Sequence, residues 1–163
     1  MVTVSWRCVA PDGPACWVAP QAASRPELAP AAKARGGGLI AVFGSAGERD
    51  VEKRSMMGRV AAERCRLVIA TDEDPRNEDP MAILDGIATG AEAAGAVRGG
   101  TLLLVQDRTT AIHEAIRSAR PGDVVLLAGK GHENTIQVAN GKEVPWDERA
   151  VVFEALRELG YSA

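Results

Sequence analysis

The sequence predicts an α/β domain: a Rossmann-like, mostly parallel sheet with helices on both faces and an antiparallel edge hairpin. Short apolar runs alternate with amphipathic stretches of helical spacing along most of the 163 residues. The runs are apolar throughout, which is typical of parallel strands covered by helices on both faces. Near the end, Asn140-Gly141 separates two short segments, and this pair tolerates the positive φ angles of a type I′ hairpin turn.

Each element follows from its own residues. The apolar runs with the composition of buried strands are residues 39–43, 66–70, 101–105 and 123–128. The hairpin strands are predicted at residues 135–138 and 142–144. Helices are predicted at residues 51–64 and 80–94, around residue 112, and at residues 147–159. Their inward stripes, in the same order, are Met56, Met57, Val60 and Ala61; Ile83, Ile87 and Ala91; Ile112, Ala115, Ile116 and Ala119; and Val152, Ala155, Leu156 and Leu159.

The chain divides into two unequal parts, residues 1–38 and residues 39–163. The first part holds two of the three tryptophans and two of the three cysteines, and no period of 3.6 or 2 runs through it. Two interpretations stay open for it: an irregular extension, or out-of-frame translation of GC-rich DNA ahead of an intact domain. Under either interpretation we assign it no chemistry, and we expect that trimming it leaves the fold intact.

Composition excludes several classes of function. A net charge of −3 supplies no basic field for nucleic acid, and no apolar run is long enough to span a membrane. We therefore expect neither nucleic acid nor a membrane as a partner. Three cysteines without CxxC spacing and only two histidines argue against a disulfide framework and a metal site. No secretory signal is evident, so the expected compartment is the cytoplasm.

Polar residues concentrate in three loops, each directly after a predicted strand: residues 44–50, 71–79 and 129–134. Ligands of parallel sheets bind outside the carboxyl ends of the strands, so these loops mark the expected site. The charged side chains gathered there are Arg49, Lys53, Arg54, Arg76 and Lys130, with Asp74 and Glu133. Fixed cations beside fixed carboxylates suit a zwitterion, because guanidinium binds carboxylate and carboxylate binds ammonium.

Each loop also has a purely structural interpretation. The glycines permit tight turns, and Asp79 is placed to cap the next helix with Pro80 at its first position. For His132, a structural role in a glycine turn is favoured over that of a lone base. Gly129-Lys130 is followed by glycine rather than Ser or Thr, so it is not a P-loop, and no GxGxxG stretch opens a helix.

Four stretches nevertheless carry a distinctive series of motifs. Residues 42–58 contain FG-x-x-G-x-RD-x-x-KR-x-x-MG, and residues 72–80 contain D-P-R followed by E-D-P. Residues 107–133 contain DR, AI and GD-x-V-x-x-AGKGHE, and residues 145–149 contain P-x-D-E-R. From residue 39 to about residue 159, this series resembles the UDP-N-acetylmuramoyl-tripeptide synthetases, and the combination of xxPR with AGKGHE is specific to this branch of the Mur ligases.

The resemblance implies an ATP-dependent ligase of peptidoglycan synthesis, with roles in cell wall biogenesis, cell shape and cell division. ATP phosphorylates the D-glutamate carboxylate of UDP-MurNAc-L-Ala-D-Glu, the amine of a diamino acid attacks, and phosphate leaves. In the family, a central domain binds ATP and Mg²⁺, and a first domain binds the uridine nucleotide; neither is in this sequence. Residues 39–163 are thus expected to be the carboxy-terminal, amino-acid-binding domain, inactive when alone.

The resemblance also carries over residue by residue. The positions that bind the far end of meso-diaminopimelate in the family are occupied here by Arg49, Asp74, Arg76, Gly129 and Glu133. Lys53 and Arg54 match basic residues near the nucleotide or phosphate, and no catalytic residue or metal ligand is assigned. Arg76 favours meso-diaminopimelate over lysine or ornithine, which lack a distal carboxylate. Asp74, where the family usually has Asn, acts in the opposite direction.

Two other functions stay open. The chain could be a stand-alone amino-acid-binding or docking module whose partner supplies the ATPase domains. A neighbouring reading frame that encodes the P-loop domain would favour a split or frameshifted enzyme, and the absence of such a frame would favour the module. An unrelated Rossmann-type oxidoreductase is the second alternative, which the missing glycine fingerprint disfavours.

Overall fold

The computed structural model describes residues 6–9, 15–19, 27–131 and 133–161, and it confirms the predicted α/β class. One sheet has the strand order β1-β2-β6-β3-β4-β5. Its strands are β1 (Trp6–Val9), β2 (Ala15–Ala19), β3 (Leu39–Phe43), β4 (Leu67–Ala70), β5 (Leu102–Leu104) and β6 (Val124–Ala128). Neighbouring strands are parallel except for β1 and β2, which pair antiparallel.

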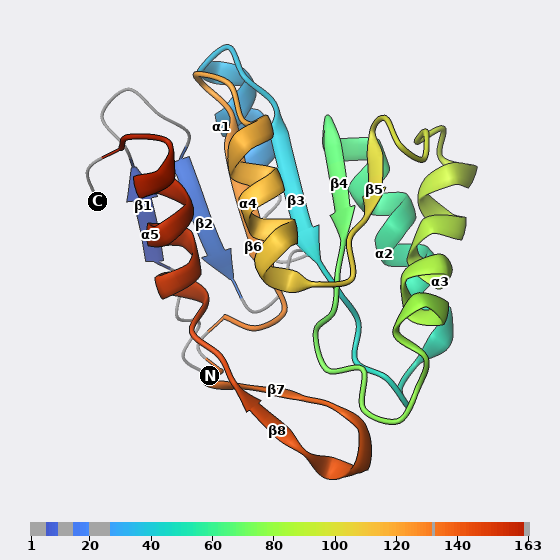
Figure 1. Cartoon of the computed structure of the whole chain (residues 1–163). Coiled ribbons are helices and arrows are strands. Elements are labelled where there is room, and N and C mark those ends of the chain that lie inside the picture. Colours follow the sequence, from blue (N-terminus) through green and yellow to red (C-terminus); the bar gives the residue numbers. More distant parts are fainter. Residues whose placement is uncertain (1–5, 10–14, 20–26, 132, 162–163) are drawn as a thin grey trace.

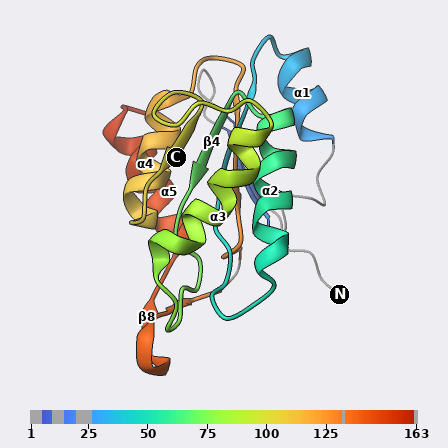
Figure 2. The same ribbon diagram turned by 90° about the vertical axis from the view of Figure 1, so that its right-hand side faces the viewer.

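Helices cover both faces of this sheet (Figure 1). They are α1 (Leu28–Ala34), α2 (Val51–Arg64), α3 (Pro80–Ala93), α4 (Arg108–Ser118) and α5 (Glu148–Glu158). Figure 2 shows α4 and α5 on one face and α1, α2 and α3 on the other. Because successive strand residues point to opposite faces, Ile40 and Val42 of β3 pack beneath α4 and α5, whereas Phe43 packs on the α2–α3 side. Among the described residues, no helix is both long and apolar enough to cross a membrane.

The helices begin at the loops that end the strands, and aspartates fix where they begin. The N-caps of α2, α3, α4 and α5 each accept a hydrogen bond from a backbone N–H of the first turn, and they are Asp50, Asp79, Asp107 and Asp147. The predicted cap at Asp79, with Pro80 at the start of the helix, is confirmed. These caps set the amino ends of four helices at the same sheet edge as the candidate site.

Helices α2 and α3 approach each other closely because glycines lie at their contact. A Cβ atom on Gly58 would lie 1.9 Å from the carbonyl oxygen of Ile87. A Cβ atom on Gly90 would lie 1.8 Å from the carbonyl oxygen of Ser55. Only glycine permits this approach, which also draws the loops before the two helices together.

The hairpin forms as predicted, but it stands apart from the main sheet. Strands β7 (Thr135–Gln137) and β8 (Glu143–Pro145) make a separate two-stranded antiparallel sheet, which projects beyond the carboxyl edge of the main one (Figure 1). Asn140 and Gly141 have φ angles of 62° and 68°, the positive values that the predicted turn requires. The antiparallel pairing at the edge of the main sheet comes from β1 instead.

Although no period runs through residues 1–38, the parts of this stretch that the structure describes include two strands and a helix. Strand β2 pairs in parallel with β6, and Leu28 and Ala32 of α1 are buried against Leu39. Strands of four and five residues are too short to display a period. Pro30 lies in the first turn of α1, where its missing N–H costs no helical hydrogen bond.

Three residues predicted to face inward are exposed: Met56, Val60 and Leu159. Leu159 is the C-cap of α5, so it lies beyond the last buried turn. Met56 and Val60 lie on a side of α2 that no other described element covers completely, and they line an open groove.

Candidate functional site

The loops after β3, β4 and β6 converge on a polar pocket of about 560 Å³, closed on one side by the hairpin. Its charged lining consists of three cations and three carboxylates: Arg49, Arg76, Lys130, Glu73, Asp74 and Glu133. The loops therefore meet where the strand-end rule predicted. Thr135 and Gln137 of the hairpin also line the pocket, a contribution that the sequence did not suggest.

Gln137 fastens the hairpin to the loop after β4. Its backbone N–H donates to Asp74 Oδ1 at 2.8 Å, and its carbonyl oxygen accepts from the backbone N–H of Arg76 at 3.1 Å. Its side-chain oxygen accepts from Arg76 Nε at 3.3 Å. Asn77 adds a further link, because its side-chain oxygen accepts from the backbone N–H of Asn140 at 2.8 Å. Asp74 and Arg76 are thus held in place by a second segment of the chain.

The Arg76 guanidinium is held by one hydrogen bond, and its other donors remain available among the described residues. Arg76 has a φ of 54°, a left-handed backbone conformation that is uncommon for arginine. Within the described part of the chain, only its Nε has a partner, and the two Nη atoms have none. Arg49 also lines the pocket, is exposed, and has no recorded partner among the described residues. Two guanidinium groups are therefore available for a carboxylate.

The Lys130 ammonium lies between two carboxylates. Its Nζ donates to Asp74 Oδ1 at 2.8 Å and also to Glu133 Oε2. The Lys130 side chain is 1 % exposed, while those of Asp74 and Glu133 are 14 % and 49 % exposed. Glu133 therefore keeps open surface on which a ligand ammonium can bind.

Glu73 forms the floor of the pocket. Burial raises the pKa of Glu73 above its usual range, against the opposing influence of the Arg108 charge. A Cβ atom on Gly129 would lie 2.9 Å from the Glu73 carboxyl, and Gly129 has a φ of 109°. Glycine is therefore required at position 129, because any side chain there would collide with this carboxyl.

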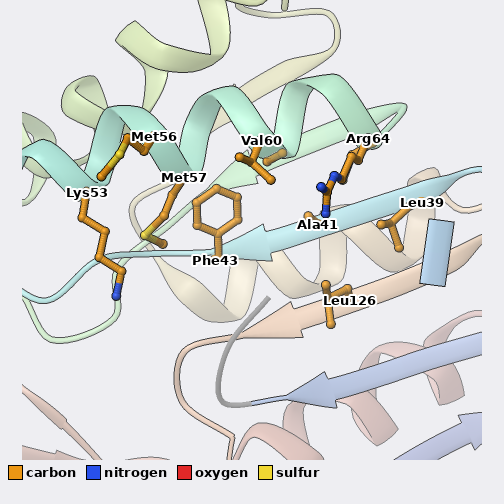
Figure 3. A pocket seen from close by; sticks show the side chains of 11 residues that line it. Leu39, Ala41, Phe43, Lys53, Met56, Met57, Val60, Arg64 and Leu126 are labelled. Atoms are coloured by element: carbon orange, nitrogen blue, oxygen red, sulfur yellow. The ribbon is translucent and has the colours of Figure 1, made fainter. Parts of the chain in front are cut away.

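The structure separates Arg54 from the predicted set. Both Nη atoms of Arg54 donate to the Glu78 carboxylate, at 2.5 and 2.7 Å, and the side chain is buried. These hydrogen bonds lower the pKa of Glu78 to about 2. Lys53 lies away from the pocket, at the end of the groove beside α2 (Figure 3). Of the seven charged residues predicted at this edge, five line the pocket, whereas Lys53 and Arg54 do not. His132 lies outside the described residues.

Sequence reasoning missed an ion pair directly behind the pocket. Arg108 donates through Nε and Nη2 to both oxygens of Glu148, at 2.9 and 2.6 Å. Its other hydrogen bonds reach the carbonyl oxygens of Ala128 and Asp72, at 2.9 and 3.1 Å. Trp146 Nε1 also donates to Glu148, at 2.7 Å. The signal in the sequence was that both charges follow a helix-capping aspartate, Asp107 and Asp147, although neither motif reveals that the other is its partner.

A second hollow differs from the pocket in chemistry. The groove beside α2 has a volume of about 260 Å³ and an almost wholly apolar lining, in which Phe43, Met57 and Leu126 face one another (Figure 3). It offers no charged pair to orient a zwitterion. The polar pocket is therefore the better candidate for binding an amino acid.

The chain has relatives among known proteins. A family model described as the Mur ligase glutamate ligase domain matches residues 22–131. The chain is 57 % identical over 125 residues to a UDP-N-acetylmuramyl-tripeptide synthetase of Roseiflexus sp., a match that covers 77 % of this chain and 24 % of the relative. It is 42 % identical over 123 residues to a UDP-N-acetylmuramoyl-L-alanyl-D-glutamate–2,6-diaminopimelate ligase of Solibacter usitatus, covering 76 % and 24 %.

The fold has a solved counterpart as well. A structure of a UDP-N-acetylmuramoyl-L-alanyl-D-glutamate–2,6-diaminopimelate ligase matches with a TM-score of 0.77 at 28 % identity, covering 98 % of this chain and 32 % of that one. The chain spans about a quarter of the length of the curated relatives it matches. The family match begins at residue 22 and ends at residue 131, so it includes α1 as well as residues 39–131.

Proposed function

The chain belongs to the Mur ligase family, and from this premise we propose that it is the amino-acid-accepting part of a tripeptide synthetase. The reaction would add a diamino acid to UDP-MurNAc-L-Ala-D-Glu in the cytoplasm, as a step of peptidoglycan synthesis. The observation that carries the proposal is the pocket in which two available guanidinium groups lie with the partly open carboxylate of Glu133. This arrangement is complementary to the carboxylate and ammonium of an amino acid.

Within this proposal, the pocket orients rather than reacts. Arg76 and Arg49 bind the distal carboxylate, and Glu133 binds the distal ammonium. Holding both charges fixes the position of the other amine, which attacks the acyl phosphate, and so lowers the entropic part of the barrier. Because Asp74 is bonded to Lys130 and to the Gln137 N–H, its charge is already compensated inside the protein. We therefore favour meso-diaminopimelate over lysine or ornithine.

ATP and Mg²⁺ enter the proposal as cofactors of a whole ligase. Among the described residues, no group of three or more His, Cys, Asp or Glu side chains could hold a metal ion. Arg54, expected near the phosphates, is bound to Glu78. These residues alone do not fit an ATP–Mg²⁺ site, and we propose that other domains of the family bind these cofactors and the uridine nucleotide. By itself the chain is then an acceptor domain without ligase activity.

Isothermal titration calorimetry of the chain with meso-diaminopimelate, lysine and ornithine tests the proposal. We expect meso-diaminopimelate to bind most tightly. Arg76→Ala should weaken its binding by about ten- to a hundredfold, the cost of a lost charge-assisted hydrogen bond, with little effect on lysine. Arg98→Ala is the matched control, since Arg98 pairs with Asp85 and Glu92 on α3 and does not line the pocket.

Two outcomes would contradict the assignment. If lysine or ornithine binds best and Arg76→Ala leaves that order unchanged, Arg76 does not recognise the distal carboxylate. If a fusion to the remaining domains of a related ligase binds the diamino acid but forms no tripeptide, a stand-alone binding module becomes the better interpretation.

A further inference from the structure

Lys130 is held inside the pocket by an unusual piece of backbone. It lies between Gly129 and Gly131, whose φ angles of 109° and 45° are both positive. Its carbonyl oxygen accepts from the backbone N–H of Glu133 at 2.7 Å, which closes a tight turn. This turn brings the ammonium and the Glu133 carboxylate of the same loop together, while Asp74 approaches from the loop after β4.

The Lys130 ammonium already occupies a position suited to a ligand ammonium. It is almost fully buried and bonded to two carboxylates, and the pocket contains only one further carboxylate, Glu73. The Glu73 carboxyl lies against Gly129, and burial raises its pKa. The groups left for a ligand are therefore Arg49, Arg76 and the open side of Glu133. Their combined charge favours a ligand end that carries a carboxylate as well as an ammonium.

We propose that Lys130 determines which acceptor the pocket takes, because its side-chain nitrogen lies between the carboxylates of Asp74 and Glu133. This inference rests on the proposed function and names the residue that sets its specificity. With Lys130 present, the Glu133 carboxylate is already shared with the lysine. A ligand whose distal end carries only an ammonium would therefore bind weakly, because it would also lie beside the guanidinium groups of Arg49 and Arg76. Without the Lys130 charge, Asp74 and Glu133 would both be free, and the same pocket would favour the lone ammonium of lysine or ornithine.

The test compares Lys130→Met with Lys130→Arg in the whole chain. Methionine keeps an unbranched side chain of similar length without the charge, whereas arginine keeps the charge. Calorimetry gives the ratio of the Kd for lysine to the Kd for meso-diaminopimelate. We expect Lys130→Met to lower this ratio about tenfold or more, and Lys130→Arg to restore most of it. Lys33→Met, on the exposed side of α1, controls for the loss of a lysine elsewhere.

A purely structural role for Lys130 predicts a different result. Both ligands would then bind more weakly by the same factor, the ratio would stay constant, and the proposal would be overturned. Thermal unfolding of each variant identifies chains that fail to fold. For such a variant, the double change Lys130→Met with Asp74→Asn removes both charges of one pair, and the ratio should still fall, because Glu133 is freed.

The proposed function can fail independently of this inference. If the wild-type chain binds none of the three diamino acids, the proposed function fails, and small ions then test Lys130. Acetate and methylammonium are titrated while the Nε–H resonance of Arg76 is followed by NMR. Lys130→Met should weaken the acetate response and strengthen the methylammonium response. If neither response changes, Lys130 does not set the charge selectivity of the pocket.

Discussion

Two buried cations lie at the carboxyl edge of the sheet, and their surroundings differ in one respect. Arg108 and Glu148 are each 1 % exposed, and the hydrogen bonds of Arg108 all end on protein acceptors. Lys130 is equally buried, but Glu133, one of its two carboxylates, is half exposed. The first cluster is closed to solvent and the second is open to it.

This difference separates a structural role from a recognition role. A closed ion pair whose partners are all satisfied joins elements that are distant in the sequence, here the start of α4 to the start of α5. Such a pair cannot exchange a partner for a ligand without a large desolvation cost. An open cluster can exchange partners, because water or a ligand reaches one of its carboxylates. Burial of a charge alone therefore does not distinguish the two clusters, whereas the exposure of its counter-charge does.

The largest expected effect is on the closed pair. Arg108→Met should lower the free energy of unfolding by about 3–5 kcal/mol, since it leaves the Glu148 carboxylate buried without its counter-ion. Urea unfolding measures the loss. The control is Arg98→Met, whose exposed ion pairs on α3 should contribute less than about 1 kcal/mol. A loss no greater than that of the control would show that the Arg108 cluster is not a closed structural pair.

The next prediction tests whether the hydrophobic core includes the amino-terminal part of the chain. Leu28→Ala should cost about 2–5 kcal/mol, because Leu28 is buried with Leu39, Val124 and Leu126 and its removal leaves a cavity. Thermal and urea unfolding of the variant measure this loss. Val97→Ala, at an exposed position, is a suitable control. An unchanged stability would restore the expectation that residues 1–38 can be trimmed without loss.

The sequence predicted the elements whose signals are local. Strand β3 and helix α2 have the predicted bounds, residues 39–43 and 51–64, because an apolar run or stripe is visible within each. The rule that loops meet at the carboxyl ends of parallel strands likewise brought five predicted residues to one pocket.

The remainder depends on contacts between distant parts of the chain. Arg54 and Arg76 both follow polar loops, yet Arg54 is engaged by Glu78 across the fold and Arg76 is not. Arg108 and its partner Glu148 are 40 residues apart, and no spacing rule links them. The hairpin's contribution to the pocket likewise becomes visible only when Gln137 is seen against Asp74. Charge type is readable from sequence, but the partner of a charge is not.

The smallest expected effect concerns Asp72, which borders the closed cluster. Its carbonyl oxygen accepts from Arg108, while burial of its carboxyl raises the pKa from 3.8 to about 6. A group whose folded pKa is raised binds its proton more tightly in the folded state, so its contribution to stability grows as the pH falls from about 6 to 3.8. Asp72→Asn should remove a gain of about 1–2 kcal/mol across this window, after allowance for solvent screening. Urea unfolding at a series of pH values measures it, with Asp85→Asn on the exposed face of α3 as control.

Glu78 should change the free energy of unfolding with pH in the opposite direction, and the same urea experiment measures it. Hydrogen bonds from Arg54 lower the pKa of Glu78 from 4.5 to about 2, so its stabilising contribution is present above pH 4.5 and is lost as the pH falls toward 2. Glu78→Gln should therefore flatten the acid limb of the stability profile, and Asp72→Asn should flatten the limb between pH 6 and pH 3.8. The two windows overlap only near pH 4, so the two variants are distinguishable by where their profiles depart from the wild type. If Asp72→Asn leaves the stability profile between pH 6 and pH 3.8 unchanged, the Asp72 carboxyl is well solvated in the folded protein. The closed cluster then begins at Arg108 rather than at Asp72.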